Sequence, residues 1–590
     1  MLFFPPTVES GTALRIEIDK PFSLENVELL KISDAPVALE FNPIALIVLA
    51  VSIVGLLLVE KKLGYFAWLR ALCVDKLTAW RELLNEGKRR TAILCIASTA
   101  VTMLTLLFIG SLILFGVYSA LSLRAAFICT AIAVLLQLLS RILSGKGDES
   151  AKLFLVLAVL TGLMMCYAMP PSIYVAWDDE THFRRAFDLM HLFSDERPMS
   201  YFRILIHQQY PLGEYAKDPA AYVSAILQGS DIMIGYHPGL SHPYSAFGYI
   251  PSMMTMVLLP LLGADVVRLV VLCRLANVLA YSLIIYLGIR KLRSGAYLFS
   301  AICLLPSAFF LACSISYDYW ITAWFAYAFA TLFSVLQDKD RTFQTSDLVK
   351  ILVAFFIGCG PKAIYCFMML PLFFLKKQKF ENPQQAKKFR MWTAITVGFM
   401  LATLIVPALI VPDLYTDTRG GSDVSTGGQI AFILSHPFQY ASILLDFLGE
   451  YVALSQLNIA GSFYAYLGYS HPIIGTLAGC LLFYCIFTDR REGDGYATMQ
   501  TFRWLTVFVT FAQMVLIATS LYVGFTPVGH ETVNGCQYRY IFPLLLPFCF
   551  FLAPKGLRSE ISRKLQNSVV FGGLAISLLG GFFSVLITTL

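Results

Sequence analysis

The sequence predicts an all-α polytopic membrane protein with about 12–14 transmembrane helices. Of its 590 residues, 57% are hydrophobic and only 14% are charged, whereas soluble domains carry about 25% charged residues. The apolar residues come in blocks long enough to cross a bilayer as helices, which need about 20 residues each. Lys and Arg cluster in short segments between these blocks, as in cytoplasmic loops. The net charge of +6 therefore belongs to loops at the membrane and does not indicate a nucleic-acid partner.

The N-terminal part should hold an extracytoplasmic tail and the first helices. Residues 1–41 contain seven Asp/Glu against three Lys/Arg, and their stretch TALRIEIDKPF alternates like a strand. We interpret this tail as a remnant of, or a truncated start to, an outer-face segment. Residues 42–59 make the first span, and the basic loop 60–90 should be cytoplasmic. Residues 42–150 are thus expected to be the N-terminal group of transmembrane helices.

Alternation of charge places the loops that follow. The chain should reach the outer face after spans at roughly 91–119, 123–143 and 152–170. Loop 172–247, with nine Asp/Glu and five Lys/Arg, is then the first large outer loop and should carry interfacial helices. Loops 412–472 and 525–540 have one cation each, Arg419 and Arg539, and are expected on the same face.

The remaining apolar sequence should complete the membrane core. We expect residues 151–565 to form this core and residues 566–590 to add a C-terminal transmembrane helix. Residues 248–263 are short and carry two prolines, so we interpret them as a segment dipping into the outer leaflet. Residues 349–375 have two short apolar arms between basic loops, which predicts a hairpin anchored at the cytoplasm with Pro361–Lys362 at its tip.

Three consecutive carboxylates, Asp178, Asp179 and Glu180, open the segment WDDETHFRRAF directly after a span. The next residues repeat apolar side chains at helical spacing, which predicts an amphipathic helix along the outer surface. One aspartate can cap this helix. Capping does not explain three acids together, nor His182 about one turn later.

Other polar residues should reach the same face. Asp318, in CSISYDYW, follows a span that runs outward, although an ordinary interfacial position is the alternative. Lys362 lies between short apolar arms, where a lysine either meets an anion or snorkels to an interface. Arg539 and nearby Gln537, in NGCQYRYIFP, lie where the chain re-enters the membrane, and Arg539 is either a phosphate ligand or an interface anchor.

This combination of charges favours one chemistry. A carboxylate can act as general base for a sugar hydroxyl, and cations can hold the phosphate of a lipid-linked donor and stabilise charge as it leaves. Transfer of a sugar from a polyprenyl phosphate fits both requirements. A transporter would instead place its charges near the middle of the bilayer.

Four stretches together resemble the bacterial family of multi-pass membrane proteins called domain of unknown function 2142 (DUF2142). They occur in the family's order over about residues 150–560, and they read WDDETHFRRAF, LLPSAFFLACSISYDYW, GPKAIYCFMMLPLFFL and NGCQYRYIFPLLLP. The chain departs from the family pattern at Tyr538, where glycine is common before the arginine, and at Thr181, where relatives often have proline.

The family is similar to GT-C glycosyltransferases, so the resemblance implies a membrane enzyme that uses a polyprenyl-phosphate sugar. It assigns the catalytic carboxylates to Asp178, Asp179 and Glu180, with Asp179 our first choice for the base. The second acidic position corresponds to Asp318, and Glu180 and His182 would position the acceptor or a metal. Donor phosphate would bind Lys362, Arg539 and Gln537.

The resemblance also implies the setting of the reaction. The acceptor would be a cell-surface glycan or a lipid-linked molecule, and the site would face the extracytoplasmic side of a bacterial plasma membrane. It leaves a divalent cation, Mg or Mn, open, and the residues themselves demand no cofactor. The alternatives are a flippase or transporter of lipid-linked sugars, a glycan polymerase or ligase, and a scaffold without catalysis.

Overall fold

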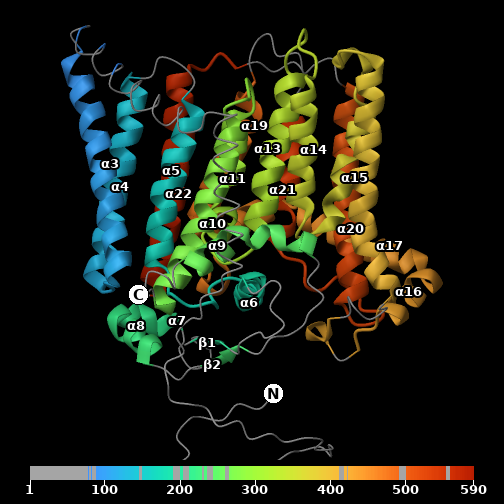
Figure 1. Cartoon of the computed structure of the whole chain (residues 1–590), viewed down its shortest axis with the longest axis horizontal. Coiled ribbons are helices and arrows are strands. Elements are labelled where there is room, and N and C mark those ends of the chain that lie inside the picture. Colours follow the sequence, from blue (N-terminus) through green and yellow to red (C-terminus); the bar gives the residue numbers. More distant parts are fainter. Residues whose placement is uncertain are drawn as a thin grey trace, which may run out of the picture.

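The computed structural model is a helical membrane bundle, which confirms the predicted all-α polytopic class (Figure 1). Tail 1–41, span 42–59 and most of loop 60–90 lie outside the described residues. The structure describes residues 78, 82, 85, 88–144, 149–190, 200–202, 212–228, 232–234, 243–258, 265–410, 417–421, 423–490, 500–552 and 559–589.

Eight helices in this described part are long and apolar enough to cross a membrane. In a bilayer such helices satisfy every backbone N–H and C=O internally. They are α3 (Arg89–Phe115), α4 (Ala120–Ser144), α5 (Ser150–Ala168), α10 (Val266–Ile289), α13 (Asp318–Leu336), α15 (Pro383–Ile410), α20 (Gln500–Gly524) and α22 (Arg563–Thr589).

Shorter helices run alongside these eight. The described residues thus hold eight candidate spans, or nine if the bent pair Thr426–Ser435 and Pro437–Val452 is one span, against the 12–14 expected, of which 42–59 is not described. The shorter helices in the bundle are α11 (Ala296–Cys303), α12 (Pro306–Ala312), α14 (Thr345–Cys359), η3 (Ala363–Phe374), α18 (Leu454–Ser462), α19 (Pro472–Thr488) and α21 (Phe542–Leu552).

Proline accounts for one break that matters for the site. Helices α11 and α12 form one interrupted path because Pro306 begins α12 and cannot donate a backbone hydrogen bond to α11. A short turn follows α12, and α13 then begins at Asp318. The prediction that Asp318 lies at a helix end is therefore confirmed.

The predicted hairpin at 349–375 is also confirmed. Helix α14 ends at Cys359, η3 begins at Ala363, and the residues between them form the tip. The segment predicted at 248–263 contains the short helix α9 (Ile250–Leu258), which follows the 3₁₀ helix η1 (Pro243–Tyr249). Neither arm of the hairpin nor α9 has the length of an ordinary span.

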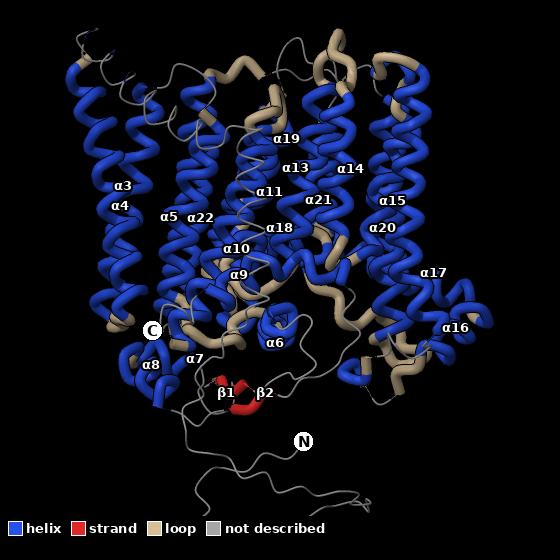
Figure 2. Tube along the Cα trace, in the orientation of Figure 1, coloured by secondary structure: helices blue, strands red, loops and turns tan. Residues whose placement is uncertain are grey.

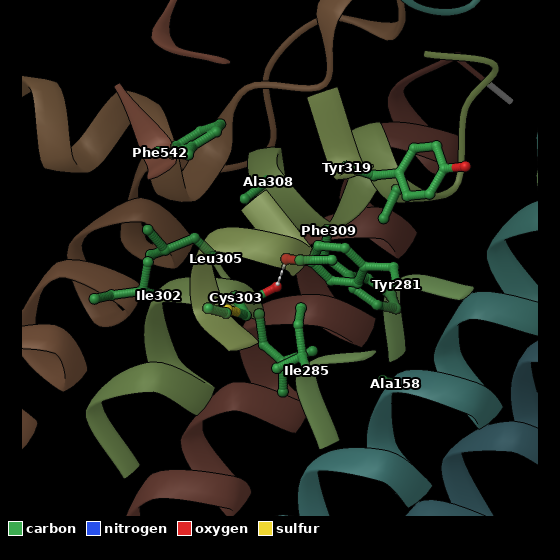
Figure 3. Packing of buried hydrophobic residues seen from close by; sticks show 14 of the residues in the cluster. Ala158, Tyr281, Ile285, Ile302, Cys303, Leu305, Ala308, Phe309, Tyr319 and Phe542 are labelled. Atoms are coloured by element: carbon green, nitrogen blue, oxygen red, sulfur yellow. Dashed lines mark hydrogen bonds between the residues drawn. The ribbon is translucent and has the colours of Figure 1, made fainter. Parts of the chain in front are cut away.

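Helix α13 lies at the centre of the bundle, between α10 and α14, and is buried along nearly its whole length. Polar groups in this apolar core are paired. Figure 3 shows the Tyr281 hydroxyl of α10 donating to the carbonyl oxygen of Cys303 in α11, beside Phe309. The two oxygens are 2.6 Å apart. Such a bond removes the cost of an unpaired carbonyl where α11 ends within the membrane.

One end of the bundle, the site face, carries short helices and the bent pair α16–α17 (Figure 1). Figure 2 places the two strands below α6 on this face, where β1 pairs antiparallel with β2 and Ser200 faces Ile234. The elements on the site face are α6 (Asp179–Met190), β1 (Ser200–Phe202), α7 (Leu212–Lys217), α8 (Pro219–Gln228), β2 (Ile232–Ile234), η1, α9, η6 (Thr418–Gly420), α16 (Thr426–Ser435), α17 (Pro437–Val452), η7 (Ala465–Leu467) and η9 (Tyr538–Tyr540).

The opposite end, the basic face, carries loops 290–295, 337–344 and 375–382, with η4 (Lys377–Lys379) in the last of them. These three loops are rich in Lys and Arg. The positive-inside rule predicts that the basic face is cytoplasmic.

This orientation predicts the outcome of cysteine labelling in intact cells. Glu531→Cys, on the site face, should react with a membrane-impermeant maleimide, whereas Lys339→Cys, on the basic face, should react only after permeabilisation. Both positions are exposed. The unsubstituted chain provides the background signal, and labelling of Lys339→Cys alone in intact cells would reverse the topology.

Candidate functional site

Two polar residues inside α10 position the segments that build the site. The Arg274 side chain is fully buried, and it donates to the carbonyl oxygens of Pro170 at 2.9 Å and Ser172 at 2.5 Å. One turn later, Asn277 donates to the Ser314 carbonyl at 3.0 Å. Helix α10 therefore anchors both the loop that leads to the acidic triplet and the turn that leads to α13. Arg274 and Asn277 could have been noticed in the sequence, because polar residues within an apolar span indicate a functional site or a buried polar contact.

The acidic and basic candidates form a chain of ion pairs. Arg539 Nη2 lies 2.6 Å from Asp178 Oδ2, and Arg539 Nη1 lies 3.4 Å from Asp318 Oδ2. Lys362 Nζ lies 3.4 Å from the other oxygen of Asp318. The structure thus brings together four of the predicted residues, from the loop after α5, the start of α13, the hairpin tip and η9.

Burial makes this chain electrostatically strong. The side chains of Arg539 and Asp318 are each only 4% exposed. Charges in such a position interact through a low effective dielectric and need partners to be tolerated. Arg539 Nη1 also donates to the carbonyl oxygen of Trp177 at 3.2 Å. The guanidinium is therefore held on several sides.

Aromatic rings surround the cations. Lys362 Nζ lies 3.5 Å from the centroid of the Tyr540 ring and 5.2 Å from that of Tyr317. The Arg539 guanidinium carbon lies 5.6 Å from the Trp177 ring centroid. Cation–π contacts of this kind add attraction without neutralising the charge, so the cations keep the capacity to attract an anion.

The two aspartates of the triplet have different environments. Asp178 has a side chain 30% exposed and the positive backbone φ of 58°, an αL conformation that aspartate tolerates better than most residues. Asp179 is 1% exposed; its Oδ2 accepts the Ala176 N–H at 2.8 Å, and its Oδ1 is buried without a hydrogen-bond partner in the described chain. The expectation that one of them caps the following helix stays a prediction. Asp178 turns to Arg539, and Asp179 stabilises its own loop.

The pKa values of these carboxyls diverge for this reason. Burial raises the pKa of Asp178, but the charge and hydrogen bond of Arg539 outweigh it and lower the value to about 2. Burial raises the pKa of Asp179 to about 7, against the nearby charge of Arg274. Asp178 is therefore an ionised, weakly basic group, whereas Asp179 is an aspartic acid that holds its proton up to near neutral pH.

Glu180 and His182 lie on the first turns of α6. Glu180 Oε2 accepts a hydrogen bond from the Tyr174 hydroxyl at 2.6 Å. His182 Nδ1 lies 2.8 Å from the Tyr249 hydroxyl, and its Nε2 is buried without a hydrogen-bond partner among the described residues. Burial, followed by the charge of Arg539, lowers the pKa of His182 to about 3, so its imidazole is neutral at physiological pH.

Gln537 and Gly248 complete the surroundings. Gln537 directly precedes η9, and its buried Oε1 has no hydrogen-bond partner within the described ranges. A Cβ at Gly248 would come within 2.6 Å of Tyr317 and 2.9 Å of Pro361. Glycine at this position therefore lets η1 approach both α13's first turn and the hairpin tip.

Arg419 reaches the site from the loop before α16, and sequence analysis did not count it as a candidate. Its Nη1 lies 3.0 Å from Asp178 Oδ1, and its Nη2 lies 2.6 Å from Asp417 Oδ2. The signal was present, because Arg419 is the sole cation in residues 412–472. Its partner could not be foreseen, since 241 residues separate Arg419 from Asp178.

The described residues contain no group of three or more His, Cys, Asp or Glu side chains placed to hold a metal ion. The carboxylates of Asp178 and Asp318 contact arginine and lysine instead. We therefore derive no step that uses the Mg or Mn considered above.

The arrangement provides fixed positive charge, a partly exposed carboxylate and a neutral imidazole at the end of a membrane bundle. These groups are suited to an anionic substrate.

Comparison with known proteins relates the chain to a family of membrane proteins. A family model described as a predicted membrane protein, DUF2142, matches residues 159–547. This range extends from α5 to α21 and includes every candidate residue named above. No curated protein and no solved structure matches the chain.

The raised pKa of Asp179 predicts how stability depends on pH. The unfolded chain ionises this carboxyl near pH 4, whereas the folded chain keeps the proton to about pH 7. The Asp179 contribution to stability should therefore fall as pH rises between these values and level off above them. Asp179→Asn keeps the acceptor for Ala176 and should become progressively more stable, relative to wild type, from about pH 4 to pH 7.

Thermal unfolding in detergent, measured for both proteins across this range, checks the prediction. His182 contributes the opposite slope below about pH 6.5, so the difference between variant and wild type is the quantity to follow. Asp446→Asn, an exposed position on α17, is the matched control. A difference that does not change with pH would contradict the assignment.

Loss of Arg274 should destabilise the protein. Arg274→Gln leaves two buried carbonyls with a weaker donor, so the free energy of unfolding should fall by about 3 kcal/mol. Arg268→Gln, on the same helix and partly exposed, should change it little. Equal melting temperatures for the two variants would show that Arg274 does not anchor the 170–172 loop.

Proposed function

The chain belongs to the DUF2142 family of predicted membrane proteins, and from that premise we propose that it is a membrane glycosyltransferase. It would move a sugar from a polyprenyl-phosphate donor to a cell-surface glycan or lipid-linked acceptor. The site face would be the extracytoplasmic side of the plasma membrane. One observation carries this proposal, namely the buried ion-pair chain that joins Asp178, Arg539, Asp318 and Lys362 at one end of the bundle.

The cations suit the leaving group. Cleavage of the bond between the anomeric carbon and the phosphate oxygen leaves its electron pair on polyprenyl phosphate. Arg539 and Lys362 would stabilise that growing charge, because both are fixed in place before the reaction by Asp318 and the surrounding rings. The Gln537 amide NH2 group, two residues from Arg539 along the chain, would donate a hydrogen bond to phosphate.

A carboxylate would complete the reaction on the acceptor side. The acceptor hydroxyl oxygen forms the new bond to the anomeric carbon, and its proton passes to the carboxylate. We now favour Asp178 over Asp179 as this base. Asp178 is partly exposed and ionised, whereas Asp179 is buried and holds its proton near neutral pH.

His182 and Asp318 would have supporting roles. Asp318 keeps the two cations 3.4 Å from its oxygens and thereby sets their separation. His182 presents a neutral ring whose Nε2 is unpaired in the described chain, so it can exchange a hydrogen bond with an acceptor hydroxyl. Glu180 acts through Tyr174 and is a positioning residue.

A transfer assay tests the proposal. Membranes that contain the chain are given a labelled polyprenyl-phosphate sugar, and glycosidic product is measured. Asp178→Asn should lower the rate by about 10²–10⁴-fold, the usual contribution of a general base, and Asp179→Asn should lower it less. Asp446→Asn, at an exposed position on α17 outside the ion-pair chain, is the matched control.

Two outcomes would reject the assignment. Undiminished transfer by both Asp178→Asn and Asp179→Asn would remove the carboxylate base. Movement of the labelled lipid across the bilayer without any glycosidic product would favour the flippase or transporter alternative.

A further inference from the structure

The carboxylate of Asp178 lies between two guanidinium groups. Its Oδ2 is 2.6 Å from Arg539 Nη2, and its Oδ1 is 3.0 Å from Arg419 Nη1. Each oxygen therefore contacts a different arginine, and the two arginines come from loops 120 residues apart in the sequence. We call Arg419 and Arg539 the arginine clamp.

The two arms of the clamp differ in their access to solvent. Arg539 is buried and held by Trp177 and Asp318. Arg419 has a side chain 66% exposed and is on a short loop. Backbone hydrogen bonds from Asp417 to Gly524 and from Val528 to Asp423 fasten this loop to the end of α20. The clamp thus has a fixed inner arm and an outer arm that a molecule at the membrane surface can reach.

A phosphate group has the same recognition chemistry as the carboxylate now in the clamp. Both present two oxygens to planar guanidinium donors, and arginine binds both in this way. We propose that the arginine clamp is a binding site for the phosphate group of a lipid-linked donor, and that Asp178 occupies it until the phosphate displaces the carboxylate. This inference rests on the proposed function and assigns Arg419 a role in donor recognition.

The charges around the clamp are balanced before a phosphate enters. Three cations, Arg419, Arg539 and Lys362, are joined by ion pairs to three carboxylates, Asp417, Asp178 and Asp318. A phosphodiester that enters the clamp brings one further negative charge. Because this charge repels the displaced carboxylate, the proton affinity of Asp178 increases.

Donor binding would therefore prepare the base. In the resting protein, Arg539 holds the pKa of Asp178 at about 2, despite burial. With Arg539 and Arg419 bound to phosphate, the pKa of the freed carboxyl returns toward its ordinary value near 4 or above it. The carboxylate then accepts the acceptor's proton more readily, and it does so only when a donor is present.

The experiment measures binding of farnesyl phosphate to the full chain in phosphatidylcholine nanodiscs. Arg419→Gln should weaken binding about 5- to 10-fold, because one charged donor is lost, and Arg419→Lys should recover part of this loss. Asp178→Asn should tighten binding about 2- to 5-fold, because the competing charge is removed. Arg268→Gln is the matched control, and farnesol, which lacks phosphate, should bind all variants alike.

Inorganic phosphate identifies the source of the ligand. If it competes with farnesyl phosphate and follows the same order of variants, the phosphate group alone is sufficient for the clamp. If it does not compete while farnesyl phosphate follows the order, the clamp requires the lipid-linked form. Weaker farnesyl phosphate binding by Asp178→Asn would overturn the proposal, because the carboxylate would then build the site, and so would unchanged binding by Arg419→Gln.

The binding assay and the transfer assay separate the two proposals. If the variants bind in the expected order but the chain transfers no sugar, the clamp stands and the glycosyltransferase proposal falls. If sugar is transferred but Arg419→Gln leaves binding unchanged, the glycosyltransferase proposal stands and the clamp falls. Unfolding temperatures equal to that of the wild type would show that each variant is folded.

Discussion

The burial of Arg539 is the constraint on which the site depends. A guanidinium keeps its charge in any protein environment, and at 4% exposure it must be surrounded by acceptors. Asp178, Asp318 and the Trp177 carbonyl supply them. These acceptors come from the loop after α5 and the start of α13. The hydrogen bonds of Arg539 therefore hold together segments that are far apart in the sequence.

The broken and short helices lie next to the ion pairs around Arg539. The break at Pro306 and the turn after α12 place the start of α13 at the site face rather than inside a continuous span. The α14–η3 hairpin brings Lys362 to Asp318 from the basic face. Helix α10 holds the loop after α5 through Arg274 and the turn before α13 through Asn277. Departures from straight apolar helices thus serve the polar cluster, and the regular helices around it provide the scaffold.

Much of the candidate site followed from the sequence, because charge is rare and costly in a membrane chain. Such residues as Asp318, Lys362 and Arg539 stood out against apolar surroundings, and all three meet. The choice between Asp178 and Asp179 did not follow. Asp178 and Asp179 are adjacent and chemically identical, so the sequence does not distinguish their roles. The structure does, because Asp178 has an αL backbone and Asp179 is buried. Arg419 was visible as a sole cation, but its loop gave no indication of a partner.

The sequence by itself determined the membrane class, the helical architecture, the basic loops and the family to which the chain belongs, because a bilayer demands long apolar helices and leaves polar residues conspicuous. Only the tertiary structure decided which charges pair, which carboxylate remains accessible and which arginine joins the site from a distant loop. Pairing depends on distances of a few ångströms between segments far apart in the chain, and neither hydropathy nor residue spacing contains that information.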